Sequence, residues 1–428
     1  MYRGGDKADM KYLKILIYLL IGLILFTGCK DGDKMLGSGT TLDPYQVATA
    51  SDLNDVRNDL HAYYIQTADI DLSGYANWVP IGAVFEDADC YQFDGFYDGQ
   101  NFSISNLTMS YPEDGDYSYY FGLFGIIGDY MGEVALSEVK NINLVNVNID
   151  AAYYTGALAG MSFAKVTNCK SSGIISGRGQ VGGLIGSTYD VGVNTEYHMS
   201  DVVGCSSSCD IYTASYDQFS WAIGGLIGYV GNYYTSKCYA TGTIRSIYEP
   251  AEDDWSAGLG GFAGDALGDR IRVGGVFVAD HDRYVIIENC YAMGDVLGGD
   301  IQIGGFLGYT SYIVKTINCY SKGLITATYD QGGFLGDQND DFSATSCYYD
   351  TETSGQSDND GRGVPKTTAE MKTQGTFVDW DFSTIWVLDS GNDGYPHFIT
   401  GVITSVQCSA LNKTRSAKTN QLISFIRK

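Results

Sequence analysis

Apolar residues recur along most of this chain in a short glycine-rich pattern, and not at the three- and four-residue spacing of a helix. In each copy a pair of apolar residues lies between glycines, as in Gly182-Gly183-Leu184-Ile185-Gly186. The seven copies, here called pentads, occupy residues 121–125, 156–160, 182–186, 224–228, 260–264, 304–308 and 332–336. β-Branched and aromatic residues are common between them, and the 428 residues include only six prolines. The pattern predicts short strands within a repeated unit.

A second signature separates the pentads. It is a cysteine, followed by tyrosine in the last four units, at Cys169, Cys205, Cys238, Cys290, Cys319 and Cys347. The two shortest units, which end at Gly186 and Gly336, have closing glycines 26 and 28 residues after the preceding ones, and in both the cysteine lies 17 residues before the closing glycine. The other units run from 35 to 44 residues, as expected for a fixed coil with loops of variable length. We therefore expect an all-β fold, a right-handed parallel β-helix of about seven repeats whose coils stack about 4.8 Å apart.

In such a coil equivalent residues of successive units lie on top of one another. The apolar pair of each pentad is expected to point inward and to form aliphatic and phenylalanine ladders. The glycines are expected where the backbone turns tightly or needs a positive φ. The residue before the cysteine is Asn168, Gly204, Asn289 or Asn318 in four units, types that tolerate the left-handed region, whereas Lys237 and Ser346 depart from this pattern.

The six repeated cysteines are interpreted as a ladder of buried free thiols, each acting as a small hydrophobic residue. Disulfides between neighbouring coils are the alternative, because the stacking would bring cysteines close together. Cys205 and Cys209, within one unit, are the pair most suited to such a bond. A linear stack does not converge as a tetrahedral metal site requires, so no metal is expected there.

The first residues predict export. Three lysines precede an apolar run over residues 15–26 that is too short to span a bilayer, which takes about 20 residues. Phe26-Thr27-Gly28-Cys29 resembles the lipobox of bacterial lipoproteins, although leucine is usual where Phe26 stands, and this implies lipidation of Cys29. An ordinary signal peptide with an incidental cysteine is the alternative. Lys30 and the acidic residues after it resemble the surface-export signal of Bacteroidetes lipoproteins, which implies an outer-membrane protein exposed at the cell surface and held by membrane lipid.

Charge narrows the range of partners. The formal net charge is −25, and removal of residues 1–28 takes away four basic and two acidic residues, which leaves −27. Such a chain repels nucleic acid, so no nucleic-acid partner is expected. The four histidines, His61, His198, His281 and His397, are far apart in sequence, and no zinc-type cluster is predicted.

Together the pentads resemble the GLUG repeat of bacterial surface proteins, some filamentous adhesins and the N-terminal parts of certain immunoglobulin-A-cleaving proteases. Residues 45–53 resemble the short N-terminal helix of that family, and Trp380-Asp381-Phe382, Trp386 and Gly394-Tyr395-Pro396 resemble its closing segment. The resemblance spans about residues 45–398 and implies a fold, not an activity. The expected organisation is a signal peptide (1–28), a flexible tether (29–44), a capping region with the first coils (45–120), the repeat β-helix (121–350), a C-terminal capping segment (351–400) and a basic tail of uncertain role (401–428).

An enzyme on this fold would need paired carboxylates, or calcium with a basic residue, on adjacent coils. The one concentrated mixture of charges lies between Gly264 and Cys290, from Asp265 to Arg283, and is interpreted as a hairpin over Ile271 to Val278 with solvated ends. No catalytic residue and no cofactor are expected. Calcium is a possible ligand of two Asp-rich loops, at Asp358 and Asp360 and at Asp389 and Asp393, although neither loop has the full EF-hand pattern.

Tyrosine pairs suggest a binding surface. Tyrosine combines a large rigid contact area with a polar tip, which suits glycan or protein ligands, and the candidates are Tyr119, Tyr120, Tyr233 and Tyr234. The alternative is that such tyrosines close the ends of the core ladders. The expected function is therefore a non-catalytic adhesin or a module that binds a host or microbial glycan or surface protein. A structural or accessory surface protein is the second hypothesis, and a polysaccharide-active enzyme is the third.

Overall fold

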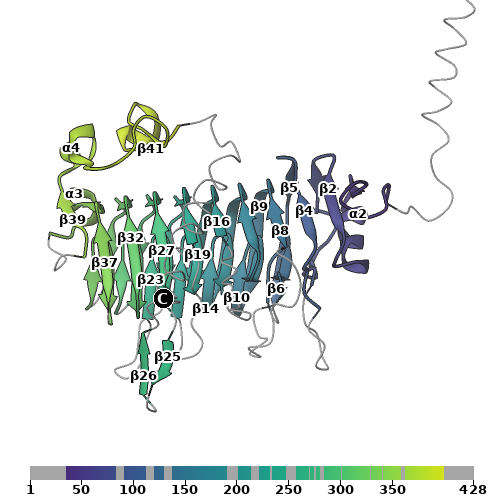
Figure 1. Cartoon of the computed structure of the whole chain (residues 1–428), viewed down its shortest axis with the longest axis horizontal. Coiled ribbons are helices and arrows are strands. Elements are labelled where there is room, and N and C mark those ends of the chain that lie inside the picture. Colours follow the sequence, from purple (N-terminus) through teal and green to yellow (C-terminus); the bar gives the residue numbers. More distant parts are fainter. Residues whose placement is uncertain are drawn as a thin grey trace, which may run out of the picture.

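The computed structural model describes residues 35–82, 91–111, 120–129, 137–189, 201–213, 221–231, 234–246, 257–268, 270–273, 276–279, 284–299, 301–327, 329–339, 341–357 and 362–399. Predictions for the signal peptide, Cys29 and the basic tail lie outside these residues. The chain winds into stacked coils with a closing segment on one side of the stack (Figure 1). The strands of four large sheets pair in parallel between successive coils, so the predicted parallel β-helix is confirmed.

One coil passes through the four sheets in a fixed order, as in β12, β13, β14 and β15. The ten-stranded sheet contains β1(Tyr45–Val47), β2(Tyr63–Gln66), β4(Phe96–Asp98), β8(Glu138–Lys140), β12(Lys165–Thr167), β16(Asp201–Val203), β20(Tyr234–Ser236), β27(Val285–Glu288), β32(Val314–Ile317) and β37(Phe342–Thr345). The fourteen-stranded sheet follows with β3(Ile70–Asp71), β5(Ser103–Ser105), β6(Thr108–Tyr111), β9(Asn143–Ala151), β13(Lys170–Gly177), β17(Ser206–Thr213), β21(Tyr239–Ala240), β22(Ile244–Ser246), β28(Tyr291–Ala292), β29(Val296–Leu297), β33(Tyr320–Ser321), β34(Ile325–Thr326), β38(Tyr348–Asp350) and β39(Val364–Lys366).

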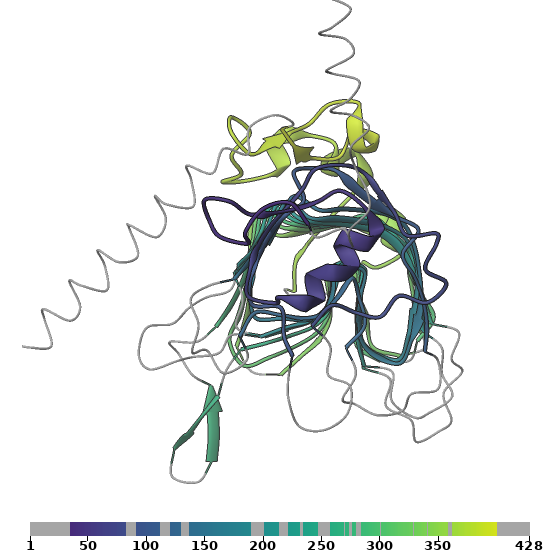
Figure 2. The ribbon, with the colours of Figure 1, turned by 90° about the vertical axis from the view of Figure 1, so that its right-hand side faces the viewer.

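The remaining two large sheets form an arch, in which each coil turns inward and back again (Figure 2). Its first arm is the six-stranded sheet of β10(Tyr153–Gly156), β14(Gly179–Gly182), β18(Trp221–Gly224), β23(Ala257–Gly260), β30(Ile303–Gly304) and β35(Gln331–Gly332). Its second arm is the seven-stranded sheet of β7(Phe124–Ile127), β11(Ala159–Ser162), β15(Ile185–Thr188), β19(Ile227–Gly231), β24(Ala263–Leu267), β31(Leu307–Ser311) and β36(Leu335–Gln338). Each pentad makes the turn from the first arm to the second.

The expected ladders fill the coil. Leu184 and Ile185 of one pentad are fully buried, and in later coils the first position of the pair becomes phenylalanine. The rings of Phe262 and Phe306 stack with centroids 4.7 Å apart, and Phe306 and Phe334 stack at 4.8 Å. Burying one such side chain contributes about 1.5–3 kcal/mol, which explains why the pair recurs in every unit.

The pentad glycines allow a close approach of backbones. A Cβ on Gly186 would lie 2.5 Å from the carbonyl oxygen of Gly160 and 2.6 Å from the amide nitrogen of Thr155, an atom of the facing arm. Gly228 and Gly264 meet the facing arm in the same way. No pentad glycine has a positive φ, so of the two expected roles only the tight packing applies to them.

The six repeated cysteines are free and fully buried, as is Cys209. The backbone N–H of Cys169 donates to Sγ of Cys205 at 3.4 Å, and that of Cys205 donates to Sγ of Cys238 at 3.3 Å. Burial raises the pKa of the Cys209 thiol to about 11, which leaves little reactive thiolate at neutral pH. The ladder of buried thiols is therefore confirmed, and the proposed Cys205–Cys209 bond is absent from these described residues.

The two ends of the stack are closed differently. At the N-terminal end residues 45–53 do not form one helix as expected. Residues 45–47 are strand β1, and α2(Ala50–Asp55) follows, begun by a capping box of Thr49 and Asp52 and continued by η1(Val56–Asn58). α2 lies across the end of the coil (Figure 2), and its Leu53 is fully buried in the coil core.

The C-terminal end leads into the closing segment, which comprises α3(Thr351–Ser354), β39, α4(Thr368–Met371), η2(Gln374–Thr376), β40(Trp386–Val387), η3(Gly391–Gly394) and β41(His397–Phe398). In the part of the chain that the structure describes, no helix has the length and apolar character needed to cross a membrane.

The residue before each ladder cysteine has a positive φ in all six units. Asn168, Asn289 and Asn318 were expected there, but Lys237 (φ 54°) and Ser346 (φ 49°) adopt the same conformation. A side chain other than glycine or asparagine pays about 1–2 kcal/mol in this region. The stacked coils therefore impose the turn even where the residue opposes it.

Replacing Ser346 with asparagine is expected to stabilise the protein by about 1 kcal/mol, because asparagine tolerates the left-handed region. The measurement is the midpoint of thermal unfolding. Ser343→Asn, on exposed β37 with an ordinary φ, is the matched control and should leave the midpoint unchanged. Equal midpoints for Ser346→Asn and the parent chain would show that the turn carries no strain.

Candidate functional site

The tyrosines after the last four cysteines point out of the coil and form a ladder of their own. Tyr239 and Tyr291 stack with ring centroids 4.8 Å apart, and Tyr291 and Tyr320 stack at 5.2 Å. The closing segment covers this ladder with a second hydrophobic cluster, separate from the coil core, that contains Met371, Phe377, Trp380, Trp386 and Tyr395. Tyr291, Tyr320 and Tyr348 are buried in this contact and are not available to a ligand, whereas Tyr239 is half-buried.

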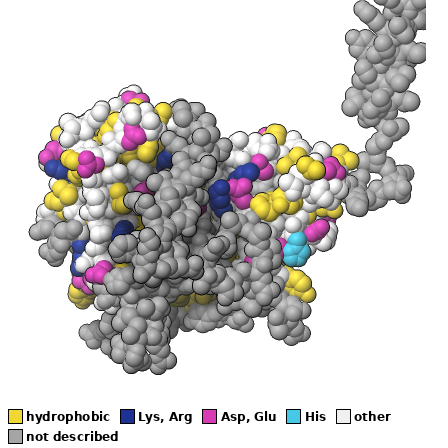
Figure 3. Space-filling model, viewed as in Figure 1, with side chains coloured by type: hydrophobic (Ala, Val, Ile, Leu, Met, Phe, Trp, Pro, Cys, Tyr) yellow, Lys and Arg dark blue, Asp and Glu magenta, His cyan; other side chains and the backbone are white. Residues whose placement is uncertain are grey.

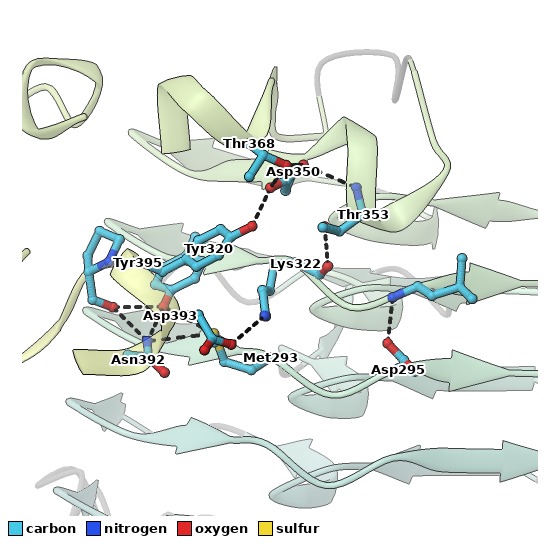
Figure 4. Close-up of polar contacts among 12 residues, drawn as sticks. Met293, Asp295, Tyr320, Lys322, Asp350, Thr353, Thr368, Asn392, Asp393 and Tyr395 are labelled. Carbon is cyan, nitrogen blue, oxygen red and sulfur yellow. Dashed lines mark hydrogen bonds and ion pairs between the residues drawn. The ribbon is translucent and has the colours of Figure 1, made fainter. Parts of the chain in front are cut away.

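A polar network fixes the same junction (Figure 4). Asp350 is fully buried and accepts hydrogen bonds from the backbone N–H groups of Glu352 and Thr353 at 2.9 and 3.2 Å, so it caps α3. The hydroxyl of Tyr395 donates to its other oxygen at 2.6 Å, and Thr368 Oγ1 lies 2.8 Å from that oxygen. This carboxylate is fully used in joining the last coil to the closing segment.

Tyr320 carries the second part of the network. Its hydroxyl donates to the carbonyl of Pro396 at 2.7 Å and accepts from Nδ2 of Asn392 at 2.9 Å. Lys322 Nζ lies 3.4 Å from Asp393 Oδ2 and 4.9 Å from the ring centroid of Tyr395 (Figure 4). The network is therefore structural, because its polar groups are bonded to one another and join the coil to the closing segment.

The calcium hypothesis can be examined at one of its two loops. Asp389 Oδ1 accepts from Nε2 of His397 at 2.9 Å and from the N–H of Gly391 at 2.7 Å, and these hydrogen bonds hold the pKa of the Asp389 carboxyl below its ordinary value. Asp393 pairs instead with Lys322. Asp358 and Asp360 lie outside the described residues. Within the described ranges, no group of three or more His, Cys, Asp or Glu residues is placed to hold a metal ion.

The tyrosine candidates are only partly described, since Tyr119 and Tyr233 lie outside the described residues. Tyr120 is half-buried, and its ring lies 4.9 Å from that of Tyr154. The hydroxyl of Tyr234, on β20, donates to Glu288. The structure does not bring Tyr120 and Tyr234 together, because Tyr120 lies beside Tyr154 on the first arm of the arch, whereas Tyr234 is on the ten-stranded sheet.

Charged side chains of both signs lie near one another on the face shown in Figure 3. Among the described residues of the ten-stranded sheet, one such group joins Glu138 to Lys140 at 2.9 Å and to Lys165 at 3.0 Å. Pairs of this kind on a solvated sheet contribute little, about 0–1 kcal/mol each. These ion pairs indicate that the outer face of the ten-stranded sheet faces solvent, and they do not indicate a binding site.

The charged insertion forms the predicted hairpin. β25(Arg270–Val273) and β26(Val276–Ala279) are antiparallel, with Ile271 opposite Val278. The hairpin stands off the body on the side opposite the closing segment (Figure 1). Asp269 and residues 280–283 lie outside the described residues.

Asp265, the first residue of that insertion, belongs to the arch instead. It lies on β24 with Tyr229 and Tyr309 as its partners in the preceding and following coils. Only 7% of Asp265 is exposed, and its Oδ1 has no hydrogen-bond partner among the described residues. Burial raises the pKa of this carboxyl well above its ordinary value. The sequence placed Asp265 among solvated charges, and only its position directly after a pentad could have indicated burial.

Comparison with known proteins shows that the sequence is similar to parts of longer proteins. It is 30% identical over 423 residues to the "Putative Gly-rich membrane protein" of Evansella cellulosilytica, a match that covers 84% of this chain and 45% of that protein. It is 32% identical over 171 residues to Halomucin of Haloquadratum walsbyi, over 37% of this chain and 2% of that protein. The chain thus spans less than half the length of these relatives. No family model matches the sequence.

Among solved structures, a "putative immunoglobulin A1 protease from Bacteroides ovatus" has the same fold, with a TM-score of 0.53 and 20% identity over 86% of this chain and 95% of that one. At this identity the likeness establishes the fold alone. It does correct one expectation. We expected a chain without enzymatic activity, because no paired carboxylates were found, but the β-helix seen here also forms nearly the whole of a chain that is named a protease.

Proposed function

We propose that this chain is a cell-surface protein, anchored through a lipidated Cys29, that binds a glycan or a surface protein through the segments projecting from its β-helix. The name of the Evansella relative supports a membrane location. The apolar run before Cys29 and the lipobox-like sequence support the anchor and its outer-membrane setting. Membership of the GLUG-repeat family is part of the same proposal and rests on the seven pentads.

The hairpin of β25 and β26 carries the binding proposal. The two strands pair only with each other among the described strands, and they interrupt an otherwise regular passage from β24 to β27. Binding residues are often carried by loops on a rigid scaffold, and in repeat proteins the insertions often lie on the binding face. The polar network at Asp350 and the tyrosine ladder under the closing segment offer no projecting segment of this kind.

The test is a glycan and matrix-protein binding screen with the purified full chain, repeated with and without calcium. A specific ligand is expected, and its binding should be lost when residues 269–283 are replaced by a short glycine-serine turn. Circular dichroism should remain rich in β structure in this variant, because β24 and β27 keep their own pairings.

The control removes polar groups of the closing segment without touching the projection, as in Asp389→Asn at the exposed loop. Its binding should equal that of the parent chain. If folded protein binds nothing on the screen, or if the hairpin replacement binds as well as the parent, the proposal fails and an accessory role at the surface becomes the better account.

A further inference from the structure

The chain joins the β-helix at Met35, only six residues after the cysteine proposed to carry the lipid. Residues 35–43, from the segment expected to act as a tether, lie against the N-terminal edge of the coil. Leu36 forms an antiparallel bridge with Gln46 of β1, in which the N–H of Gln46 donates to the carbonyl of Leu36 at 2.8 Å. Met35 packs against the coil core. The connection between the fold and Cys29 is therefore short.

The segment turns back on itself between Thr40 and Asp43. The N–H of Ser38 donates to the carbonyl of Asp43 at 2.9 Å, and Thr40 and Asp43 exchange backbone hydrogen bonds of 3.3 and 3.2 Å. The N–H of Tyr63, on β2, donates to the carbonyl of Gly39 at 3.0 Å. The turn is thus held by its own hydrogen bonds and by the first strand of the next coil.

This ordered segment exposes two leucines. Leu42, within the turn, is 97% exposed, the highest value for a large hydrophobic side chain among the described residues, and Leu36 is 69% exposed. Turn positions are usually occupied by glycine, proline or small polar residues, so a leucine there has no conformational reason. One exposed leucine is ordinary on a protein surface. Two of them beside the connection to a proposed lipid anchor indicate an apolar surface that covers both.

The covalent length of the chain limits where that surface can be. Six residues span no more than about 22 Å even when fully extended. With the acyl chains of Cys29 in a bilayer, the N-terminal edge of the coil stays within this distance of the lipid. Such a short connection gives Leu36 and Leu42 a high effective concentration at the bilayer surface, so even a weak apolar contact is populated.

Aromatic side chains extend the apolar character over the first two coils. Tyr63 and Phe96 are register partners on β2 and β4, at the N-terminal end of the stack (Figure 1), and their rings stack with centroids 4.4 Å apart. Both are half-buried, and neither belongs to a hydrophobic cluster of the described residues. In the next two coils Glu138 and Lys165 hold the equivalent positions. The outer face is therefore least polar near the anchor, and tyrosine is common at the level of lipid headgroups.

We propose that the N-terminal edge of the β-helix lies on the lipid bilayer, with Leu36 and Leu42 inserted among the headgroups beside the lipidated Cys29. This inference rests on the lipid anchor of the proposed function. The polar neighbours of Leu42, including Asp43, limit the insertion to a shallow depth. A neutral lipid surface fits best, because a net charge of −25 disfavours anionic lipid. The stack then extends away from the membrane and carries the hairpin of β25 and β26 with it.

The test uses the purified lipidated full chain in phosphatidylcholine vesicles, with an NBD fluorophore attached at Leu42→Cys. Cys90 and Cys408, which lie outside the described residues, are replaced by serine, and the repeated cysteines are buried. A blue-shifted NBD emission that brominated phosphatidylcholine quenches is expected, and Leu36→Ser should reduce the quenching. Val378→Cys, at a 58% exposed position of the closing segment, is the matched control and should report water without quenching.

Flotation with the vesicles separates this inference from the anchor on which it rests. Cys29→Ser should no longer float, whereas the double change Leu36→Ser and Leu42→Ser should float like the parent chain, because the acyl chains remain. If the parent floats but NBD at position 42 reports water, the anchor is correct and the docking is wrong. A blue shift that needs no lipid and grows with protein concentration would assign the leucines to a second copy of the chain instead. A parent chain that does not float would overturn both proposals.

Discussion

Replacing Gly264 with alanine is expected to destabilise the protein by about 3 kcal/mol, at the upper end of the cost of overpacking. The new Cβ would lie 2.2 Å from the amide nitrogen of Ile223 and 2.3 Å from the carbonyl carbon of Ala222. Both are backbone atoms of the facing arm and cannot rotate away. The arms would have to separate in the middle of the stack, so the coils above and below would lose pairing as well. The measurement is the midpoint of thermal or denaturant unfolding.

Gly375→Ala provides the control, because no atom lies within 4 Å of a Cβ at that position and its φ is not positive. Its stability should be unchanged, or slightly raised through the smaller entropy of the unfolded chain. Equal losses in the two variants would point to a general effect of the substitution. An unchanged midpoint for Gly264→Ala would mean that the two arms are not in contact as described.

The repeating core was predictable from sequence because each ladder residue has an equivalent one coil away. Leu184 and Phe262 occupy one ladder position, and aligning the pentads of successive units gives the register of the ladders directly. Physical reasoning about stacking then requires parallel strands, which the structure confirms. The arch was not predicted, because the pentad pattern is compatible with a turn between any two strands of the coil.

Features that break the repeat were harder to predict. On the first arm, Tyr154, Gln180 and Ala222 have positive φ, and none of these residue types favours that conformation. Stacking imposes it, as it does at Lys237, so local propensity is a poor guide there. The burial of Asp265 depends on a glycine in the facing arm, Gly258, and such a contact between distant segments has no local signal.

The docking of the closing segment is visible in the sequence of the repeats. Cysteine is followed by tyrosine only in the last four units, whereas Lys170 and Ser206 hold that place in earlier coils. The structure shows why, since the closing segment covers those last coils and needs an apolar outer surface there. A change of residue type at an outward position of the repeat therefore indicated a contact with another part of the chain. This contact was not predicted from the sequence.

Trp386→Ala is expected to release the closing segment while the coils stay folded. Trp386 is fully buried, its ring lies 4.3 Å from that of Trp380 and 4.7 Å from that of Phe398, and its Nε1 donates to Asn289 of the coil at 3.2 Å. Truncating a buried tryptophan costs about 3–5 kcal/mol. Because this cluster is separate from the coil core, the loss should be local. Hydrogen exchange should accelerate in residues 367–399, and limited proteolysis should remove them.

Phe382→Ala is the matched control within the same segment. Phe382 is half-buried, and its ring centroid lies 6.1 Å from that of Phe377 and 6.4 Å from that of Trp380. It should change exchange in the segment only slightly. If Trp386→Ala instead accelerates exchange equally in the closing segment and throughout the coils, the two parts unfold as one cooperative unit. The Asp350 network would then couple them more strongly than the separation of their apolar clusters implies.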